Sequence, residues 1–367
     1  MFTWYAKMWI KKLELYQFRN YKTLSLEFEK GVNVIIGDNG EGKTSLVEAI
    51  GMFPFSKSLR TNDEKELIQL GEQFTKIEGV FSKEFEEKIK IVISKQKKVI
   101  EINDSEVKKV SSLAGIVKVV SFLPKDVELF KGSPSNRRRF IDYTMAMLDK
   151  NYLLQLNEYN KLLESIRESL KEDIDYTYLE VLVKQLCERG RKLQIRRSKY
   201  LSLLNEELKS ISKYIEKDEN KIEVLYRPDI DVEDIDEEKY FDKVWNKLKQ
   251  SLEVQRNARG VIKGIHQDDI QMNFEGKNLS MYGSQGENRI SVIALKLALI
   301  KMMKITFKEE PIVILDDVLS ELDENHQRKL IQLLNRIEQV FITGTKINFV
   351  EKYTLYNVKD NVVRRKS

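Results

Sequence analysis

The sequence contains very little cysteine, histidine and proline. Among its 367 residues there are 1 Cys, 2 His and 5 Pro. The single Cys187 excludes an internal disulfide and a zinc site built from several thiolates, and it is typical of a reducing compartment. His266 and His326 lie far apart in the sequence, so a histidine metal centre is not expected.

Long apolar runs and a strong excess of one charge are also absent. No run approaches the roughly 20 apolar residues needed to cross a bilayer, and the first residues lack the pattern of a cleaved leader. Lys plus Arg number 63 and Asp plus Glu 58, so the net charge of +5 does not by itself indicate nucleic acid. The hydrophobic fraction of 41% excludes a disordered chain. We expect a folded cytoplasmic protein without a membrane partner, with Met8 as an alternative start.

Strand patterns dominate the two ends of the chain. Short apolar alternations run from Ile10 to Phe28, with a turn at Arg19 to Lys22, and VNVII at 32–36 is typical of a buried strand. Further strands are predicted at 74–81 and 88–102. Near the other end, PIVILDDV and QVFITGT indicate two buried parallel strands.

The middle of the chain has a helical pattern. From Arg137 to about Lys217 there is no proline and one glycine, Gly190, with apolar residues at helical spacing. Breaks are expected at 171–175 and 229–238, and another helix from Tyr240 to about Asn257. We therefore predict an α/β lobe formed by both termini, 1–122 and 260–367, with a mainly helical lobe, 123–259, inserted between them.

A phosphate-binding loop follows the VNVII strand. The segment GDNGEGKT matches G-x-x-x-x-G-K-[ST], and SLVEAI continues it as a helix, which is the context this motif requires. Glycines let backbone N–H groups converge on phosphate oxygens, and the helix N-terminus adds partial positive charge. Lys43 is expected to reach the β and γ phosphates and Thr44 to bind Mg²⁺. The predicted nucleotide-binding residues here are Gly37, Asp38, Asn39, Gly40, Glu41, Gly42, Lys43, Thr44 and Ser45.

Two aspartates end the buried strand PIVILDDV. The carboxyl ends of parallel strands are where ligands collect in α/β folds. Asp316 is predicted to hold Mg²⁺, directly or through a water, and Asp317 to act as the base that orients or deprotonates an attacking water. The alternative is that these are ordinary strand-end acids beside a helix cap.

A third motif, YGSQGENR, precedes the apolar helix ISVIALKLALIKMMK. Taken alone, Ser284 could simply cap this helix. Taken in chain order with the other two motifs, it resembles the SxG loop of ABC-type ATPases.

The combination resembles the RecF family of ABC-type ATPases. It is carried by QFRNYK, the phosphate loop, FLPKDVELFKGSPSNRRRFID, YGSQGENR and LDDVLSELD, between about Met8 and Ile342. The resemblance implies ATP and Mg²⁺ as cofactors and an ATP-dependent homodimer. Ser284, Gly286 and Glu287 would then cap the γ phosphate of the partner subunit. Asp323 would lie at the same dimer seam, and Arg19 would approach the nucleotide.

The sequence departs from the family pattern at three places. GIHQDD at 264–269 stands where a GPHRDD-like segment is usual, so the role of this segment is open. FITGTKIN has no histidine after the strand, and the hydroxyl of Thr343 or Thr345 is a weak substitute. Asp317 is shorter than the usual glutamate, which predicts slow hydrolysis.

Basic residues suggest where DNA would bind. The candidates are Arg137, Arg138, Arg139, Arg196 and Arg197; the alternative is a solvated helix face balanced by glutamates. The resemblance implies binding to duplex DNA and single-strand gap junctions, with RecR, and with RecO and RecA downstream, in DNA repair, replication restart and the SOS response.

Three other readings compete with this one. A transport ATPase subunit predicts a histidine switch and a short insert, and an SMC-like protein predicts hundreds of heptad residues; the sequence has none of these. An ABC-like ATPase of a defence system, acting through a protein effector, remains open.

Overall fold

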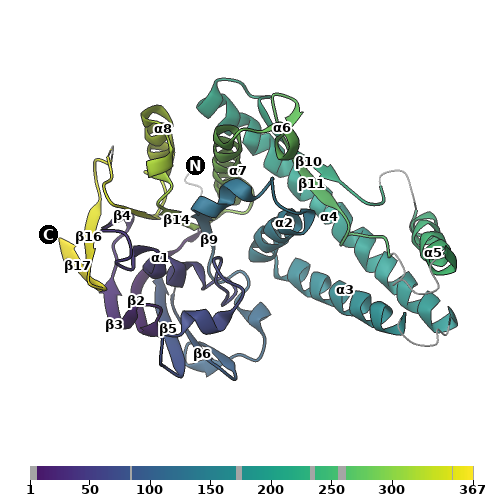
Figure 1. Ribbon diagram of the computed structural model, residues 1–367, viewed down its shortest axis with the longest axis horizontal. Helices are drawn as coiled ribbons and strands as arrows, with labels where there is room; N and C mark the ends of the chain where they lie inside the picture. The colour runs from purple at the N-terminus through teal and green to yellow at the C-terminus, as the bar shows by residue number, and fades with distance from the viewer. Residues whose placement is uncertain are drawn as a thin grey trace. The chain divides into compact units, whose positions relative to one another are not determined.

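The computed structural model describes residues 6–82, 85–170, 176–231, 236–254, 262–348 and 350–366. The chain forms two compact units (Figure 1): Met1–Asp126 with Leu299–Ser367, and Val127–Ala298. The first boundary lies near the predicted one at residue 122. The second differs from the predicted residue 260 and falls inside helix α7 (Gln285–Thr306).

A six-stranded sheet forms the centre of the first unit. Its order is β17-β16-β4-β15-β14-β9, and all neighbours are parallel except β16 and β17. The strands are β4 (Gly31–Ile36), β9 (Val119–Phe122), β14 (Ile312–Asp316), β15 (Gln339–Gly344), β16 (Thr354–Lys359) and β17 (Val362–Lys366). The terminal halves of the chain therefore share one sheet, as the sequence predicts.

A second six-stranded sheet in this unit is antiparallel, in the order β3-β2-β5-β6-β7-β8. It contains the predicted strand pair and meander: β2 (Trp9–Phe18), β3 (Tyr21–Glu27), β5 (Phe74–Ser82), β6 (Glu86–Ser94), β7 (Lys98–Ile102) and β8 (Ser105–Glu106). A short parallel pair, β1 (Ala6–Lys7) with β13 (Glu309–Glu310), adds to the unit.

One apolar core joins the two sheets and α1 (Lys43–Gly51). Leu13 and Ile91 come from the antiparallel sheet, Ile314 and Phe341 from the parallel sheet, and Ile50 from α1, and all are buried. Helix α1 contacts β9, β14 and β15. This packing fixes the start of α1 at the carboxyl ends of the parallel strands. Helix α8 (Glu324–Leu334) connects β14 to β15.

The second unit is built around long helices, as predicted. They are α2 (Pro134–Leu148), α3 (Lys150–Ser169), α4 (Tyr176–Glu216) and α5 (Glu237–Val254). Helix α4 packs against both α3 and α5. Asp149 caps α3 by accepting hydrogen bonds from the N–H groups of Asn151 and Tyr152. The predicted break at 171–175 lies outside the described residues, as do 232–235 of the acidic stretch and the predicted end of the helix at Asn257.

A small antiparallel sheet in the second unit was not predicted. Its strands are β10 (Ile222–Arg227), β11 (Asp269–Phe274) and β12 (Lys277–Asn278), and β10 packs on α4. Because β11 pairs with β10, the segment after residue 261 groups with the helices. This explains why the unit extends into α7. None of the helices in the described part of the chain is long and apolar enough to cross a membrane.

Candidate nucleotide-binding site

The predicted phosphate loop connects β4 to α1. Gly42 caps α1 with φ 102°, a left-handed conformation that favours glycine. The Lys43 ammonium is buried and donates to the carbonyl oxygens of Gly37 (2.8 Å) and Asp38 (2.9 Å). Asp38, Asn39 and Gly40 are exposed, and Ser45 is buried in α1. The loop therefore holds its lysine close to its own backbone while its tip faces solvent.

Thr44 and Asp316 lie in direct contact, although they are 272 positions apart. The Thr44 hydroxyl donates to Asp316 Oδ1 at 3.0 Å, and the Thr343 hydroxyl donates to the same oxygen at 2.7 Å. Burial raises the pKa of the Asp316 carboxyl, and the two hydroxyl donors only partly oppose this. A hydroxyl and a carboxylate are the hard oxygen ligands that Mg²⁺ prefers, so this pair fits that ion.

Asp317 has an unusual backbone conformation, with φ 53°. Its N–H donates to the Thr343 hydroxyl (3.0 Å), and its carbonyl accepts from the Ser320 hydroxyl (2.8 Å). Positive φ is uncommon outside glycine and collects at functional sites. The side chain of Asp317 is half-buried beside Asp316. Thr343 thus orders the backbone of Asp317 and the carboxyl of Asp316, whereas Thr345 is exposed.

Arg19 lies against α1 through a buried carboxylate that the sequence did not indicate. Glu48, on the turn of α1 after Thr44, accepts from Arg19 at 2.8 and 3.1 Å, from Arg60 at 3.2 Å and from Ser58 at 2.5 Å. Its side chain is 1% exposed. Glu48 and Arg60 line a cavity of about 10 Å³ together with Thr44 and Asp316. The missed signal was the helical spacing between Thr44 and Glu48.

The SxG segment, in the second unit, forms the start of α7. Ser284 and Glu287 form a capping box: the Glu287 N–H donates to the Ser284 hydroxyl (3.2 Å), and the Ser284 N–H donates to the Glu287 carboxylate (2.7 Å). This hydrogen bond lowers the pKa of Glu287. The helix-cap interpretation is therefore correct as a local description. It leaves Ser284 and Gly286 exposed at a helix N-terminus, which is a favourable environment for phosphate.

Two glycines in this segment have different surroundings. A Cβ on Gly283 would lie 2.5 Å from the Asn288 amide and 2.7 Å from the Leu279 carbonyl, so Gly283 is required by packing after α6 (Leu279–Tyr282). A Cβ on Gly286 would meet nothing within 4 Å. Packing within this unit does not explain why position 286 has no side chain.

Asp323 caps helix α8. Its carboxylate accepts from the N–H groups of Asn325 (3.0 Å) and His326 (3.1 Å), and it also contacts the His326 ring. The bonds with His326 lower the pKa of Asp323. The side chain is nevertheless 62% exposed and remains available to a partner.

The structure corrects the DNA prediction at Arg137 and Arg197. Arg137 is 7% exposed and forms a two-pronged ion pair with Asp269, at 2.7 and 2.9 Å. Arg197 is 2% exposed, so its guanidinium cannot reach a phosphate on the surface. Both arginines are needed inside the unit to neutralise carboxylates.

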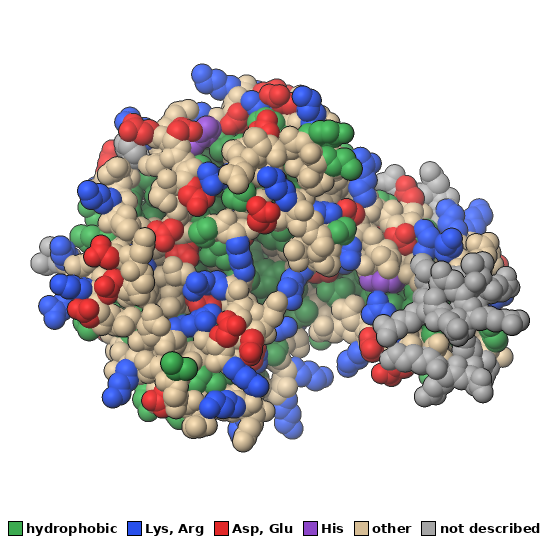
Figure 2. Space-filling model, in the orientation of Figure 1, with side chains coloured by type: hydrophobic (Ala, Val, Ile, Leu, Met, Phe, Trp, Pro, Cys, Tyr) green, Lys and Arg blue, Asp and Glu red, His purple; other side chains and the backbone are tan. Residues whose placement is uncertain are grey.

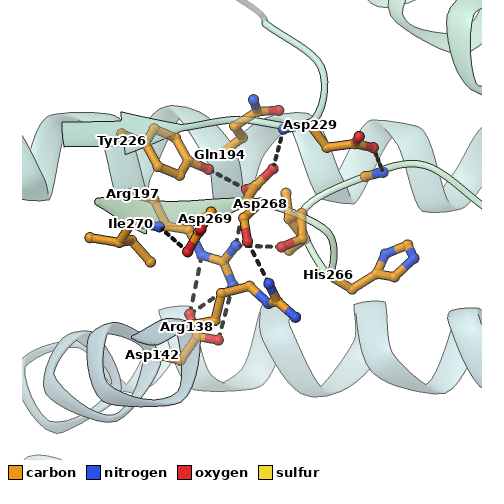
Figure 3. Close-up of polar contacts among 12 residues, drawn as sticks. Arg138, Asp142, Gln194, Arg197, Tyr226, Asp229, His266, Asp268, Asp269 and Ile270 are labelled. Atoms are coloured by element: carbon orange, nitrogen blue, oxygen red, sulfur yellow. Dashed lines mark hydrogen bonds and ion pairs between the residues drawn. The ribbon is translucent and has the colours of Figure 1, made fainter. Parts of the chain in front are cut away.

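A buried polar cluster surrounds Arg197 (Figure 3). The guanidinium donates to Asp142 on α2 (2.8 and 2.9 Å) and to Asp268 just before β11 (3.1 Å). Asp268 also accepts from the Tyr226 hydroxyl and from the Asp229 N–H (2.9 Å). The GIHQDD segment is therefore an internal anchor that ties β11 to α2 and α4. The sequence signal for this cluster was the Asp268–Asp269 pair itself.

The other predicted DNA-contacting arginines are less buried. Arg138 is half-buried and donates to the Asp268 carbonyl (2.5 Å), and burial lowers its pKa. Arg139 is exposed, and Arg196 pairs with Asp149 and Gln155. On the face drawn in Figure 2, basic and acidic side chains are interspersed. Arg196 is balanced by an acidic neighbour, Asp149.

The sequence matches the family described as RecF/RecN/SMC N terminal domain over residues 9–364. It is 37% identical over 359 residues to the DNA replication and repair protein RecF of Bacillus cereus (strain G9842), covering 96% of each chain. The same identity and coverage hold for RecF of Bacillus thuringiensis (strain Al Hakam).

Solved structures show the same relationship. A structure described as the recombination mediator protein RecF-ATP in the RecFOR pathway has a TM-score of 0.91 at 31% identity and covers 99% of both chains. An Smc head bound to the C-winged helix domain of ScpA has a TM-score of 0.56 at 16% identity, which shows a shared fold. The predicted ABC-type ATPase fold with a helical insertion is thus confirmed. The chain belongs to the RecF family of DNA replication and repair proteins.

Proposed function

We propose that this protein is an ATP-dependent DNA-binding recombination mediator that dimerises around two ATP molecules. The observation that carries the nucleotide site is the contact of Thr44 with Asp316, which joins the phosphate loop to the acidic strand end. The likeness to a RecF-ATP structure supports ATP as the nucleotide.

Within this site, each residue has a distinct task. Lys43 exchanges its carbonyl partners for the β and γ phosphates, and the glycine-rich backbone surrounds those phosphates. Thr44 and Asp316 would hold Mg²⁺, and the ion would supply charge neutralisation at the phosphate oxygens. Asp317 orients the attacking water, with its backbone held by Thr343. Its short side chain supports slow hydrolysis, so ATP serves mainly as a switch.

The second subunit completes the site. The exposed N-terminus of α7 offers N–H groups and partial positive charge to a γ phosphate. The open space around Gly286 supports close approach of a partner, since packing within its own unit does not require a glycine there. Ser284, Gly286 and Glu287 would then act in trans, with Asp323 at the same seam. ATP contributes binding energy to the dimer, and hydrolysis removes it.

Sedimentation with ATP tests the dimer. Asp317→Asn should accumulate as a dimer with ATP because hydrolysis is blocked, and Ser284→Arg should stay monomeric while still binding ATP. Ser165→Arg, on the exposed face of α3, is the matched control and should dimerise normally. A monomeric Asp317→Asn protein at saturating ATP would contradict the arrangement.

DNA binding separates this function from that of a defence-system ATPase acting through a protein effector. We propose that the dimer binds duplex DNA and single-strand gap junctions in the cytoplasm and acts with RecR, RecO and RecA. Affinity for duplex DNA with ATP should fall steeply as salt rises. Failure to bind DNA at low salt by a protein that still dimerises would remove the DNA role and leave the ATPase.

A further inference from the structure

The last two described strands form a β-hairpin that lies beside the phosphate loop. Strands β16 and β17 pair with Lys359 opposite Val362, which leaves Asp360 and Asn361 as a two-residue turn. Both turn residues are left-handed, with φ 51° and 58°. Because β16 runs parallel to β4, the turn lies at the same edge of the sheet where the phosphate loop begins.

The hairpin contacts the phosphate loop near both of its ends. At the start, a Cβ on Gly37 would fall on the carbonyl oxygen of Val358 in β16. Near the end, the N–H of Asp360 donates to the carboxylate of Glu41. Residues more than 300 positions apart in the sequence are thus held together at this loop.

Gly42 is enclosed from two sides. A Cβ at this position would lie 2.9 Å from the Tyr21 hydroxyl and 3.2 Å from Asn361 Oδ1. The Tyr21 hydroxyl donates to the Gly42 carbonyl at 3.1 Å. Asn361 Oδ1 is buried and has no hydrogen-bond partner in the described part of the chain. A two-residue turn needs only its backbone conformation to close a hairpin, so the hairpin does not explain this buried amide oxygen.

We propose that the Asp360–Asn361 turn positions the phosphate loop for nucleotide, with Asn361 and the Asp360 N–H as the positioning groups. The proposal rests on the nucleotide site proposed above. Loop N–H groups bind phosphate only when they converge, and a glycine-rich loop does not hold that geometry unaided. The turn acts on the outer side of the loop, so it changes phosphate affinity without touching the nucleotide.

The proposal is tested by measuring how tightly the Asn361→Gly variant binds phosphate ligands. Glycine keeps the left-handed turn and removes only the side chain. The matched control is Asp104→Gly, at the second position of the two-residue turn between β7 and β8, with φ 62°. We expect Asn361→Gly to weaken binding of a fluorescent non-hydrolysable ATP analogue about tenfold, the size of roughly one hydrogen bond to a charged phosphate. Asp104→Gly should bind as the wild type does.

Two further readouts separate positioning from general loss of structure. Asn361→Gly should lose as much affinity for inorganic tripolyphosphate, measured by competition with the fluorescent analogue, as it loses for the analogue itself. The reason is that the loop binds phosphates and not the base. The thermal unfolding midpoint should change equally in Asn361→Gly and Asp104→Gly. The proposal would be overturned if Asn361→Gly lost affinity for the ATP analogue but kept wild-type affinity for tripolyphosphate. It would also be overturned if the loss of affinity followed the fall in the unfolding midpoint in both Asn361→Gly and Asp104→Gly.

Glu41→Ala removes the carboxylate on the loop that accepts from the Asp360 N–H. It is the second test variant if Asn361→Gly folds poorly. It should also weaken tripolyphosphate binding, and the double variant should lose less than the product of the two single losses, because both changes loosen the same turn from the same loop. Wild-type affinity in Glu41→Ala and Asn361→Gly would refute the positioning role. If the wild type itself bound no more tightly than Lys43→Met, the nucleotide site would fail, which is a separate outcome.

Discussion

Each unit of this protein contains an Asp-Asp pair, and the two pairs have opposite surroundings. Asp268 and Asp269 lie in the second unit, where Arg197 and Arg137 neutralise them. Asp316 and Asp317 lie in the first unit, where the hydrogen-bond donors to the Asp316 side chain are the uncharged hydroxyls of Thr44 and Thr343. Burial raises the pKa of both Asp268 and Asp316.

The difference separates a structural carboxylate from one arranged for a ligand. A buried charge is costly unless a counter-charge accompanies it. At Asp268 the counter-charge is the Arg197 guanidinium, which belongs to the protein itself. At Asp316 the hydrogen-bond donors to the side chain are uncharged, and a bound cation would complete this arrangement.

The largest effect should come from removing the internal counter-charge. Arg197→Met leaves the buried Asp268 and the half-buried Asp142 without their guanidinium partner and should lower the free energy of unfolding by about 3 to 5 kcal/mol. Urea unfolding measures this. Arg196→Met, at the neighbouring and more exposed position, should cost about 1 kcal/mol or less. Equal effects in the two variants would contradict the burial of Arg197.

Asp316→Asn should have the opposite profile. The amide removes a buried charge whose hydrogen-bond donors are uncharged hydroxyls, so the free energy of unfolding should stay within about 1 kcal/mol of the wild type or rise. Mg²⁺-dependent ATP hydrolysis should fall about 100-fold, since a metal contributes several kcal/mol to the transition state. Steady-state turnover over a Mg²⁺ series checks this. Full turnover in Asp316→Asn would remove Asp316 from the metal site.

The sequence predicted the surroundings of Asp316 and Asp317 far better than those of Asp268 and Asp269. The phosphate loop, the strand of Asp316 and the cap at Ser284 are local patterns, and each depends on residues within one turn or strand. Arg197 was misassigned because exposed and buried arginines look alike on a helix until their long-range partners are known. The pairing of β10 with β11, which moves the unit boundary into α7, is also long-range. Glu48 was missed although it lies one helical turn after Thr44, because its partners Arg19 and Arg60 lie outside α1 and only the fold brings them to it.

A smaller effect is expected from one hydroxyl of the complete cluster. Tyr226→Phe removes a donor to Asp268 but leaves Arg197 and the Asp229 N–H in place, so it should cost about 1 to 2 kcal/mol of unfolding free energy. The exposed Tyr176→Phe is the control and should cost nothing measurable. ATP binding should be unchanged in both. A loss as large as that of Arg197→Met would mean that the hydroxyl stabilises Asp268 as much as the guanidinium does.

The smallest effect distinguishes the two units by the sign of their pH dependence. Burial lowers the pKa of His266 from 6.5 to about 4, and its Nδ1 lies 2.7 Å from the Tyr159 hydroxyl. A base with a lowered pKa contributes stability above its unfolded pKa, and this is lost as pH falls from about 6.5 to about 4. Asp316, an acid with a raised pKa, contributes stability below its unfolded pKa that is lost as pH rises through the folded value.

Unfolding measured across this range should therefore give opposite changes in the two variants. His266→Gln should lose less stability than the wild type between pH 6.5 and pH 4. Asp316→Asn should gain stability relative to the wild type as pH rises above about 4. The same sign in both variants would mean that one of the carboxyl or imidazole groups is not buried as described, because desolvation acts in opposite directions on an acid and a base.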